Sequence, residues 1–288
     1  MEEQPLAGGF VNTVVRVADT VRRTPGPRAH YVHALLRFLE QRGWPGAPRF
    51  LGIDDRGREM LSFVPGHVAW EARQPPDVSA DASLVRVAEL LRAFHDLTAG
   101  TPLAAGGEVV CHNDLSPKNT VYAPHGPARP GPDARPDARP GGPPGDAALR
   151  PVAFLDWDIA APGERVHDVA HVCWQYVGLG PTLADPDEAA RRIRLIADAY
   201  GLSAHDRGRL LDTVLWWQDR CWRGIRSAAA AGEPAMRRLH ESGVTERVRA
   251  AHAWTAAHRE RLTAPLTPPP SPRAHDPNTQ PPPHGDHA

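Results

Sequence analysis

Short apolar runs rich in β-branched residues, each closed by a turn signal, occupy the first part of the chain. Residues 10–17 read FVNTVVRV and residues 20–23 read TVRR, with a short polar turn between them. Residues 49–54 (RFLGID) and 58–66 (REMLSFVPG) form a second such pair around another polar turn. Runs of this composition that are bounded by turns are typical of strands. The pattern therefore predicts a small, strand-rich region at the N-terminus.

Apolar residues at helical spacing dominate the rest of the chain. Residues 28–42, within the strand-rich part, show this spacing and are predicted to form a helix. Residues 83–98 show a continuous apolar stripe and are predicted to form a second helix. Ser83 is a predicted N-cap of that second helix, and Gly100 is its predicted end. Further helices are predicted at residues 168–176, 187–200, 206–224 and 244–262. The strand-rich region is thus expected to be followed by a mainly helical one.

Two segments carry no apolar periodicity. Residues 123–150 are rich in Pro, Gly, Ala, Arg and Asp, and residues 265–288 are rich in Pro. Such segments cannot bury enough apolar surface to offset the entropy of ordering them. The first joins two runs that a short turn would normally connect. We interpret it as a disordered insert in a hairpin loop, and the second as a disordered tail.

Composition narrows the class of protein. The chain has 288 residues, of which 41% are hydrophobic, and a formal net charge of −1. This charge gives no indication of nucleic-acid or membrane-surface binding. Three cysteines without paired spacing favour a reducing compartment. We find no signal peptide and no apolar run of the ~20 residues that a membrane span needs, and we expect a soluble cytoplasmic protein.

The stretch VVCHNDLSPKNTVY (residues 109–122) concentrates the candidate chemistry. It reads as a short strand, a polar loop and a second strand. Asp114 is followed five residues later by Asn119, and the next apolar run, VAFLDWD, ends on Asp156. An acid, an amide and a second acid in this order can converge on one point, where a kinase needs a base and two Mg²⁺ ligands. Carboxylate and amide oxygens are ligands that Mg²⁺ accepts.

These motifs resemble the aminoglycoside phosphotransferase family, small-molecule kinases with a protein-kinase-like fold. The resemblance rests on HNDLSPKN and on FLDWDIAAPGERVHDVA. The family pattern has Gly where this chain has Asn113. The resemblance implies an α+β, two-lobed fold, with a strand-rich N-lobe (residues 1–66) and a mainly helical C-lobe (67–264). Asp168 resembles the family's structural aspartate, which caps a helix and braces the catalytic loop.

The resemblance also implies roles for the central residues. Asp114 would be the catalytic residue that accepts the proton of the acceptor hydroxyl and orients its oxygen. Asn119 and Asp156 would hold Mg²⁺, with Asp158 as the second choice of acid. His112 is expected to brace the loop. His95, which ends the apolar stripe of the preceding helix, is expected to be a hydrogen-bonded structural residue packed under the catalytic loop.

The phosphate-gripping cation of the N-lobe must be an arginine, because the one lysine of the chain is Lys118. Alternate residues of a strand share a face, so Val21 and Arg23 point the same way, as the family's adenine contact and cation do. Arg23 is the first choice for this cation and Arg22 the second. The helix acid that pairs with the cation in the family has no counterpart here, because His33 stands at about that level.

The segment MLSFVPG resembles the hinge between the lobes, where Ser62 and Val64 would present backbone groups to adenine. Together these expectations give an ATP- and Mg²⁺-dependent phosphotransferase that acts on a hydroxyl of a small molecule, and the resemblance suggests an aminoglycoside. The candidate acceptor zone is Trp216-Trp217-Gln218-Asp219, and acids at positions 206, 212, 219, 233 and 241 are available for a cationic acceptor. The alternative is a nucleotide-binding pseudokinase with a regulatory role. The sequence does not indicate an oligomeric state.

Overall fold

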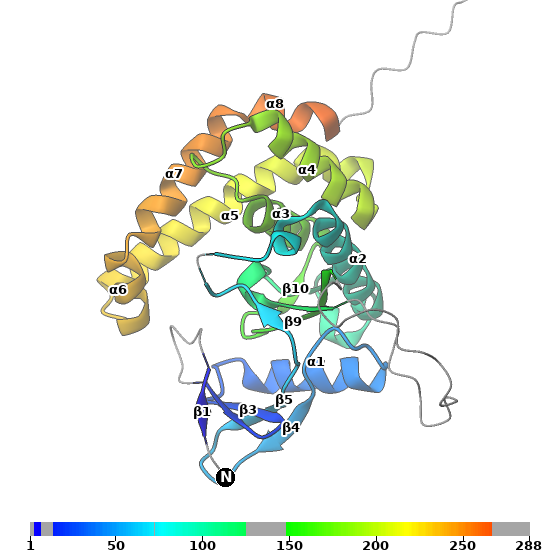
Figure 1. The fold of residues 1–288 in the computed structure, drawn as a ribbon, viewed down its shortest axis with the longest axis vertical. Helices are drawn as coiled ribbons and strands as arrows, with labels where there is room; N and C mark the ends of the chain where they lie inside the picture. The colour runs from blue at the N-terminus through cyan, green and yellow to red at the C-terminus, as the bar shows by residue number, and fades with distance from the viewer. Residues whose placement is uncertain (1–2, 7–13, 72, 125–147, 267–288) are drawn as a thin grey trace, which may run out of the picture.

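The computed structural model describes residues 3–6, 14–71, 73–124 and 148–266. These residues form an antiparallel sheet region at the N-terminal end and a mostly helical region beyond it, drawn at the bottom and top of Figure 1. The predicted α+β class, strand-rich first and helical afterwards, is confirmed. None of the described helices is long and apolar enough to cross a membrane.

The N-terminal sheet has five antiparallel strands in the order β1-β2-β3-β5-β4. Their bounds are β1 Gln4–Pro5, β2 Val15–Val17, β3 Thr20–Arg23, β4 Phe50–Ile53 and β5 Glu59–Ser62. Within the described residues, the predicted strand at residues 10–17 appears as Val15–Val17; residues 10–13 lie outside the described part. The helix α1 (Ala29–Gln41) buries its predicted apolar face, which contains Val32, Leu35, Leu36 and Leu39.

The helical lobe has seven α-helices within the described residues, and all of them except α6, which has no buried residue, pack in or against one core. They are α2 (Asp81–Thr98), α3 (Arg165–Val177), α4 (Pro186–Tyr200), α5 (Ala204–Ala230), α6 (Pro234–Glu241), α7 (Val244–Ala257) and α8 (Arg259–Thr263). Short 3-10 turns lie at η1 (Pro76–Ser79), η2 (Pro102–Ala104), η3 (Pro117–Asn119) and η4 (Ala264–Leu266). The core of α1, α2, α3 and α4 is continuous across the two lobes.

Two small sheets at the base of the helical lobe carry the loops of the candidate site. One has the order β6-β8-β9, with β6 His67–Val68, β8 Thr120–Pro124 and β9 Leu149–Phe154. The other pairs β7 (Val109–Cys111) with β10 (Ala161–Gly163). The predicted insert joins β8 to β9, which pair as a hairpin up to Pro124 and Leu149. Residues 125–147 of the insert lie outside the described part.

Several boundaries differ from the prediction. Ser83 lies inside the first turn of α2 rather than at its N-cap, because its hydroxyl donates to the Asp77 carbonyl of the preceding 3-10 turn. The predicted helix at residues 244–262 is divided at His258 into α7 and α8. The predicted tail starts at residue 265, whereas Leu266 still packs in the core and the rest, 267–288, lies outside the described residues.

Candidate active site

The loop between β7 and β8 holds Asp114 and Asn119 against each other. The Asn119 Nδ2 donates to the Asp114 carbonyl at 2.8 Å and to its Oδ2 at 2.9 Å. Asn119 ends the 3-10 turn η3, which Pro117 begins, and only 6% of its surface is exposed. Because Nδ2 is used within the loop, Oδ1 is the atom that Asn119 can offer to a cation. The loop therefore holds the Asp114 carboxylate in place and leaves Asn119 Oδ1 outside these bonds.

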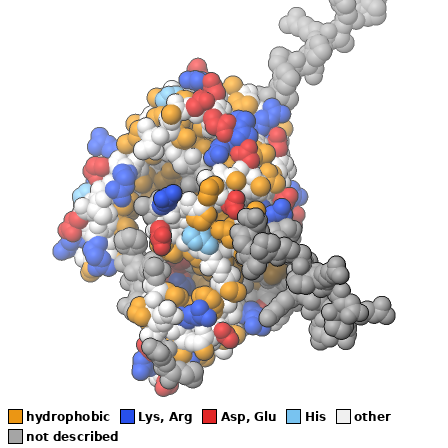
Figure 2. Space-filling view, in the orientation of Figure 1, with side chains coloured by type: hydrophobic (Ala, Val, Ile, Leu, Met, Phe, Trp, Pro, Cys, Tyr) orange, Lys and Arg blue, Asp and Glu red, His pale blue; other side chains and the backbone are white. Residues whose placement is uncertain are grey.

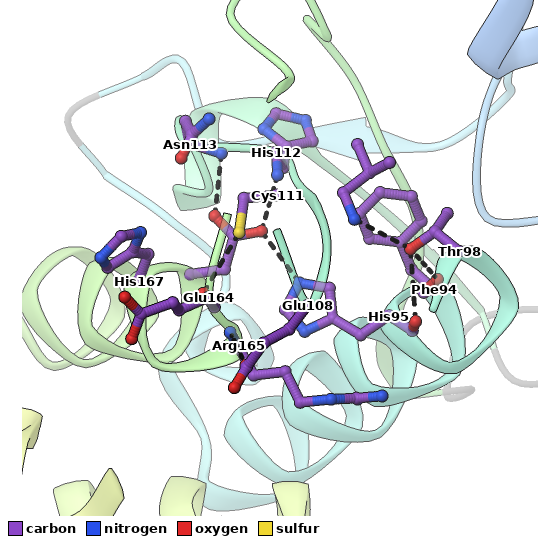
Figure 3. A network of polar contacts seen from close by, with 12 residues as sticks. Phe94, His95, Thr98, Glu108, Cys111, His112, Asn113, Glu164, Arg165 and His167 are labelled. Atoms are coloured by element: carbon purple, nitrogen blue, oxygen red, sulfur yellow. Dashed lines mark hydrogen bonds and ion pairs between the residues drawn. The ribbon is translucent and has the colours of Figure 1, made fainter. Parts of the chain in front are cut away.

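Asp168, near the start of α3, braces this loop by hydrogen bonds to its backbone. Figure 3 shows the surrounding polar network, in which His95, His112 and Asn113 are labelled. Its Oδ2 accepts from the His112 backbone N–H at 2.6 Å, and its Oδ1 accepts from the Asn113 N–H at 2.8 Å. His95 Nε2 lies 3.2 Å from the same carboxylate. Burial opposes the charge on Asp168, but the bond from His95 and the neighbouring histidines outweigh it and lower the pKa of Asp168. The expected structural roles of Asp168 and His95 agree with these contacts.

The backbone at Asn113 is left-handed, with φ of 67°. Glycine adopts this conformation freely, and asparagine tolerates it better than most residues. The Asn113 Nδ2 also donates to the Ile159 carbonyl at 3.0 Å. The geometry thus explains why asparagine can replace the glycine of the family pattern.

Asp156 is brought to the loop by β9, which runs beside β8. The Leu155 N–H donates to the Asn119 carbonyl at 2.8 Å, and His112 Nε2 donates to the Leu155 carbonyl at 3.0 Å. Asp156 itself is exposed and also left-handed, with φ of 61°. The next residue, Trp157, is buried in the core. The backbone therefore turns at Asp156 and leaves its carboxylate exposed, one residue beyond the bond between Leu155 and Asn119.

The charge on Asp114 is disfavoured by its surroundings. Burial first, and then the negative charge of Asp156, raise the pKa of Asp114 to about 7, although the bond from Asn119 acts in the opposite direction. A carboxyl group that titrates near neutrality is suited to exchange a proton with a hydroxyl. Burial also raises the pKa of Asp158, in spite of its contact with Arg23.

Arg23 reaches from β3 across to the two acids that follow β9. Its Nη1 lies 3.1 Å from Asp156 Oδ1 and 3.1 Å from Asp158 Oδ2, and its Nη2 also bonds to Asp158. Burial disfavours the charge, but Asp158, Glu59 and Asp156 outweigh it and raise the pKa of Arg23. Arg22 points the other way, and its Nη1 donates to Asp54 Oδ2 at 3.3 Å. Strand alternation places the two arginines as expected.

The carboxylate that supports Arg23 was missed by the sequence analysis. Glu59 Oε1 accepts from Arg23 Nε at 2.5 Å, and Glu59 Oε2 lies 2.6 Å from His33 Nε2. In the family the supporting acid lies on the helix that corresponds to α1, whereas here it comes from β5, where Glu59 is the direct register partner of Arg23. The signal available in the sequence was Glu59, an acid within the predicted strand at residues 58–66. A carboxylate in a core strand indicates a partner, because an unpaired carboxylate is rarely buried.

The two hinge residues differ in what they offer. The Ser62 N–H donates to the Arg49 carbonyl, and Ser62 Oγ accepts from the Arg49 N–H, each at 2.8–2.9 Å. Ser62 is thus engaged within the sheet, because β5 lies between β3 and β4. Among the described residues, Val64 donates no backbone hydrogen bond, so its N–H is available to a ligand. A hollow of about 440 Å³ beside this segment is lined by Ser62–Pro65 and by Trp44.

The predicted acceptor zone on α5 lies near the catalytic loop. The Trp217 ring packs 5.1 Å from His171, whose Nδ1 donates to the Leu115 carbonyl. Trp216 is 46% exposed and stacks on His167, and both line an open hollow of about 290 Å³.

Two of the acids proposed for a cationic acceptor are held by arginines. Asp212 pairs with Arg259, and Asp219 pairs with Arg223. Asp206 accepts from Ser203 at the start of α5. Charged side chains of both signs are interspersed over the face shown in Figure 2, which presents no extended patch of one sign.

Comparisons of the sequence with known proteins give two matches. The sequence profile of the phosphotransferase enzyme family (APH) matches residues 2–108, which end just before the catalytic loop. The Trifolitoxin immunity protein of Rhizobium leguminosarum bv. trifolii is 28% identical over 298 residues, which cover 92% of this chain and 99% of that protein.

Solved structures of kinases share the fold at low identity. A choline/ethanolamine kinase family protein from Mesorhizobium loti matches with a TM-score of 0.57 and 15% identity, over 92% of each chain. Aminoglycoside 2′-phosphotransferase-IIIa in its GDP complex matches with 0.54 and 13%, over 88% of this chain and 93% of that one. A microcompartment-associated aminopropanol kinase matches with 0.55 and 11%, over 92% and 94%.

The fold is thus shared with small-molecule phosphotransferases, and the profile match over residues 2–108 agrees with the resemblance to the aminoglycoside phosphotransferase family that the two motifs indicate.

Proposed function

We propose that this protein transfers the γ-phosphoryl group of a nucleoside triphosphate to a hydroxyl group of a small molecule. The observation that carries the proposal is that Asn119 Nδ2 bonds to Asp114 Oδ2, while the Leu155 N–H, next to Asp156, bonds to the Asn119 carbonyl. The family and the fold support it. ATP is the expected donor, and GTP is tested beside it because one structural neighbour is a GDP complex.

Asp114 is the proposed catalytic residue. With a pKa of about 7, its carboxylate can accept the hydroxyl proton and hold the attacking oxygen in line with the phosphorus. Its orientation is set by Asn119 Nδ2, and the backbone on its N-terminal side is set by Asp168. The loop therefore supplies a preorganised acceptor for the proton.

The donor set of the proposed Mg²⁺ site is one amide oxygen, from Asn119, and one exposed carboxylate, from Asp156. Hard divalent cations of this size prefer oxygen ligands and retain several waters, which suits an exposed site with few protein ligands. The contact of Asp156 with the Arg23 guanidinium shows that a positive group is accepted here. When bound, Mg²⁺ would neutralise charge on the phosphate oxygens.

The remaining proposed contacts concern the nucleotide. Arg23 is placed to bind phosphate oxygens, and a guanidinium can bind two of them at once. At the hinge, the Val64 N–H supports adenine binding better than Ser62, whose groups are used in the sheet. The aminoglycoside acceptor that the resemblance suggests has little support from α5, where Asp212 and Asp219 are paired with arginines.

A second candidate function is toxin immunity, which the name of the 28% identical relative favours. A pseudokinase would provide immunity by binding a toxin, without any phosphoryl transfer. The two functions are separated by turnover of ATP and GTP with a panel of hydroxylated amines and hydroxy acids, together with Asp114→Asn. Transfer that disappears in Asp114→Asn supports the kinase, whereas nucleotide binding without turnover for every acceptor supports the pseudokinase.

A further inference from the structure

The carboxylate of Glu59 has two partners and is almost fully buried, since only 1% of the residue is exposed. Arg23 Nε donates to one oxygen at 2.5 Å, and His33 Nε2 lies 2.6 Å from the other. A buried carboxylate destabilises a fold unless it is paired and hydrogen-bonded. Both carboxylate oxygens of Glu59 have a partner, so the burial of this acid is compensated.

We propose that Glu59 is a positioning residue for Arg23, and that His33 holds Glu59 in the orientation that this role requires. The inference rests on the proposed function and deepens it. Glu59 takes the Nε edge of the guanidinium, so that Nη1 and Nη2 point to the space between Asp156 and Asp158.

The register of the sheet explains why the supporting acid comes from β5. Arg23 and Glu59 are direct cross-strand partners in the β3–β5 pair, so their side chains start from neighbouring positions on one face. The carboxylate consequently meets the near edge of the guanidinium, while the far edge continues to the other lobe. His33 comes down from α1 and stacks on Phe50 with 3.7 Å between the ring centroids, which fixes the plane of the imidazole.

This arrangement also accounts for arginine at a position where the family has lysine. A guanidinium has donors on both edges, at Nε and at the two Nη atoms, whereas a lysine carries all its donors on one terminal nitrogen. Lysine could not bond to Glu59 and reach Asp156 and Asp158 in the same way. Arg23 and Glu59 are thus a matched pair, and the Nη groups are the ones that can exchange a carboxylate oxygen for a phosphate oxygen.

The test is a double-mutant cycle on nucleotide affinity. The dissociation constant of a fluorescent ATP analogue with Mg²⁺ is measured without acceptor for Glu59→Gln, Arg23→Ala and the double variant. Loss of a charged hydrogen bond predicts roughly tenfold weaker binding for Glu59→Gln. In the Arg23→Ala background the same change should have no further effect, because Glu59 acts only through Arg23.

A matched control is Asp54→Asn, which removes a buried carboxylate that pairs with the neighbouring Arg22 on the opposite face of the strand. Thermal unfolding of each variant shows whether it folds. Asp54→Asn should lower stability and leave nucleotide affinity unchanged. His33→Ala is the second variant if Glu59→Gln does not fold, and it should weaken binding by a smaller factor that also disappears without Arg23.

Additive effects of Glu59→Gln and Arg23→Ala, or unchanged affinity in Glu59→Gln, would overturn the positioning role. Wild-type protein that binds nucleotide but transfers no phosphate would instead contradict the proposed function and leave the positioning role supported by the cycle. Wild-type protein that binds neither ATP nor GTP would contradict both.

Discussion

Single residues with unusual backbone angles define the geometry of the candidate site. Asn113 and Asp156 both have left-handed backbones; Asn113 precedes the proposed catalytic residue Asp114, and Asp156 is itself a proposed metal ligand. Conformations of this kind cost about 1–2 kcal/mol for residues with a Cβ atom, less for Asn and Asp, and they persist where the surroundings enforce them. At Asn113 the carboxylate of Asp168 and the carbonyl of Ile159 provide that enforcement.

The conformation of Asn113 gives a stability prediction. Asn113→Gly and Asn113→Ala both remove the side-chain bond to Ile159, but only alanine also has to adopt the left-handed region with a Cβ atom. We expect Asn113→Ala to be less stable than Asn113→Gly by about 1 kcal/mol. Urea unfolding of the two variants measures this difference. Equal stabilities would mean that the loop relaxes to another backbone conformation.

The role of Asp114 gives a prediction on turnover. Asp114→Asn should keep the fold, because the amide oxygen can still accept the bond from Asn119 Nδ2. It should lower phosphoryl transfer by on the order of 10²–10⁴-fold, the range that general base catalysis contributes. Steady-state kinetics and nucleotide titration check the two parts. Turnover within a few-fold of the wild type would exclude the proposed role.

At the scale of elements, α3 and its neighbours hold the catalytic loop by buried polar contacts. Asp168 and His171, one turn apart on α3, bond to the backbone at opposite ends of the segment from His112 to Leu115. The shape of the loop therefore depends on the protonation states of Asp168 and His171. Burial lowers the pKa values of His95 and His112 as well.

His171 gives a prediction on pH. Burial lowers its pKa to about 4, from the ordinary value of 6.5. The unfolded chain then binds more protons than the folded one between these values, so stability is complete above pH 6.5 and is lost as the pH falls towards 4. The contribution is at most about 3 kcal/mol.

The change that tests it is His171→Gln, which keeps a donor for the Leu115 carbonyl. Between pH 7 and pH 4.5, wild-type protein should lose about 2 kcal/mol more unfolding free energy than this variant. Urea unfolding at several pH values measures the loss. His205→Gln, at an exposed position, serves as the control and should follow the wild type. Parallel curves for wild type and His171→Gln would exclude the assignment.

At the scale of the whole molecule, the candidate site combines residues from both lobes, some of which precede the insert in the sequence and some of which follow it. Arg23 comes from the N-terminal sheet, Asp114 and Asn119 precede the insert, and Asp156 follows it. The ends of the insert are adjacent, because Pro124 and Leu149 are register partners in the β8–β9 hairpin. The hairpin brings the residue before Asp156 against Asn119, since the Leu155 N–H donates to the Asn119 carbonyl.

Deletion of residues 127–145 and closure with a short turn should therefore leave both stability and turnover within a small margin of wild type. Loop-closure entropy predicts a gain of about 1 kcal/mol or less from the shorter connection. Thermal unfolding and acceptor kinetics measure the result. A large rise in KM for the acceptor would assign the insert to the acceptor site, and insoluble protein would assign it to the fold.

The sequence by itself determined the order of the lobes, the helices with long apolar stripes and the candidate residues Asp114, Asn119 and Asp156. These features are local, because they depend on the periodicity of side chains and on motif spacing within short segments. The choice of Arg23 over Arg22 also came from local strand alternation, and the structure places their side chains on opposite faces.

Tertiary structure decided what depends on pairing between distant segments. The partnership of Glu59 with Arg23 follows from the β3–β5 register, and no periodicity within either strand encodes it. The short strands β6 and β10 have too few residues to show alternation, and they exist because β8 and β7 offer them hydrogen bonds. In the same way, Ser62 is engaged at the end of β5 because Arg49 lies beside it, a contact that only the folded sheet creates.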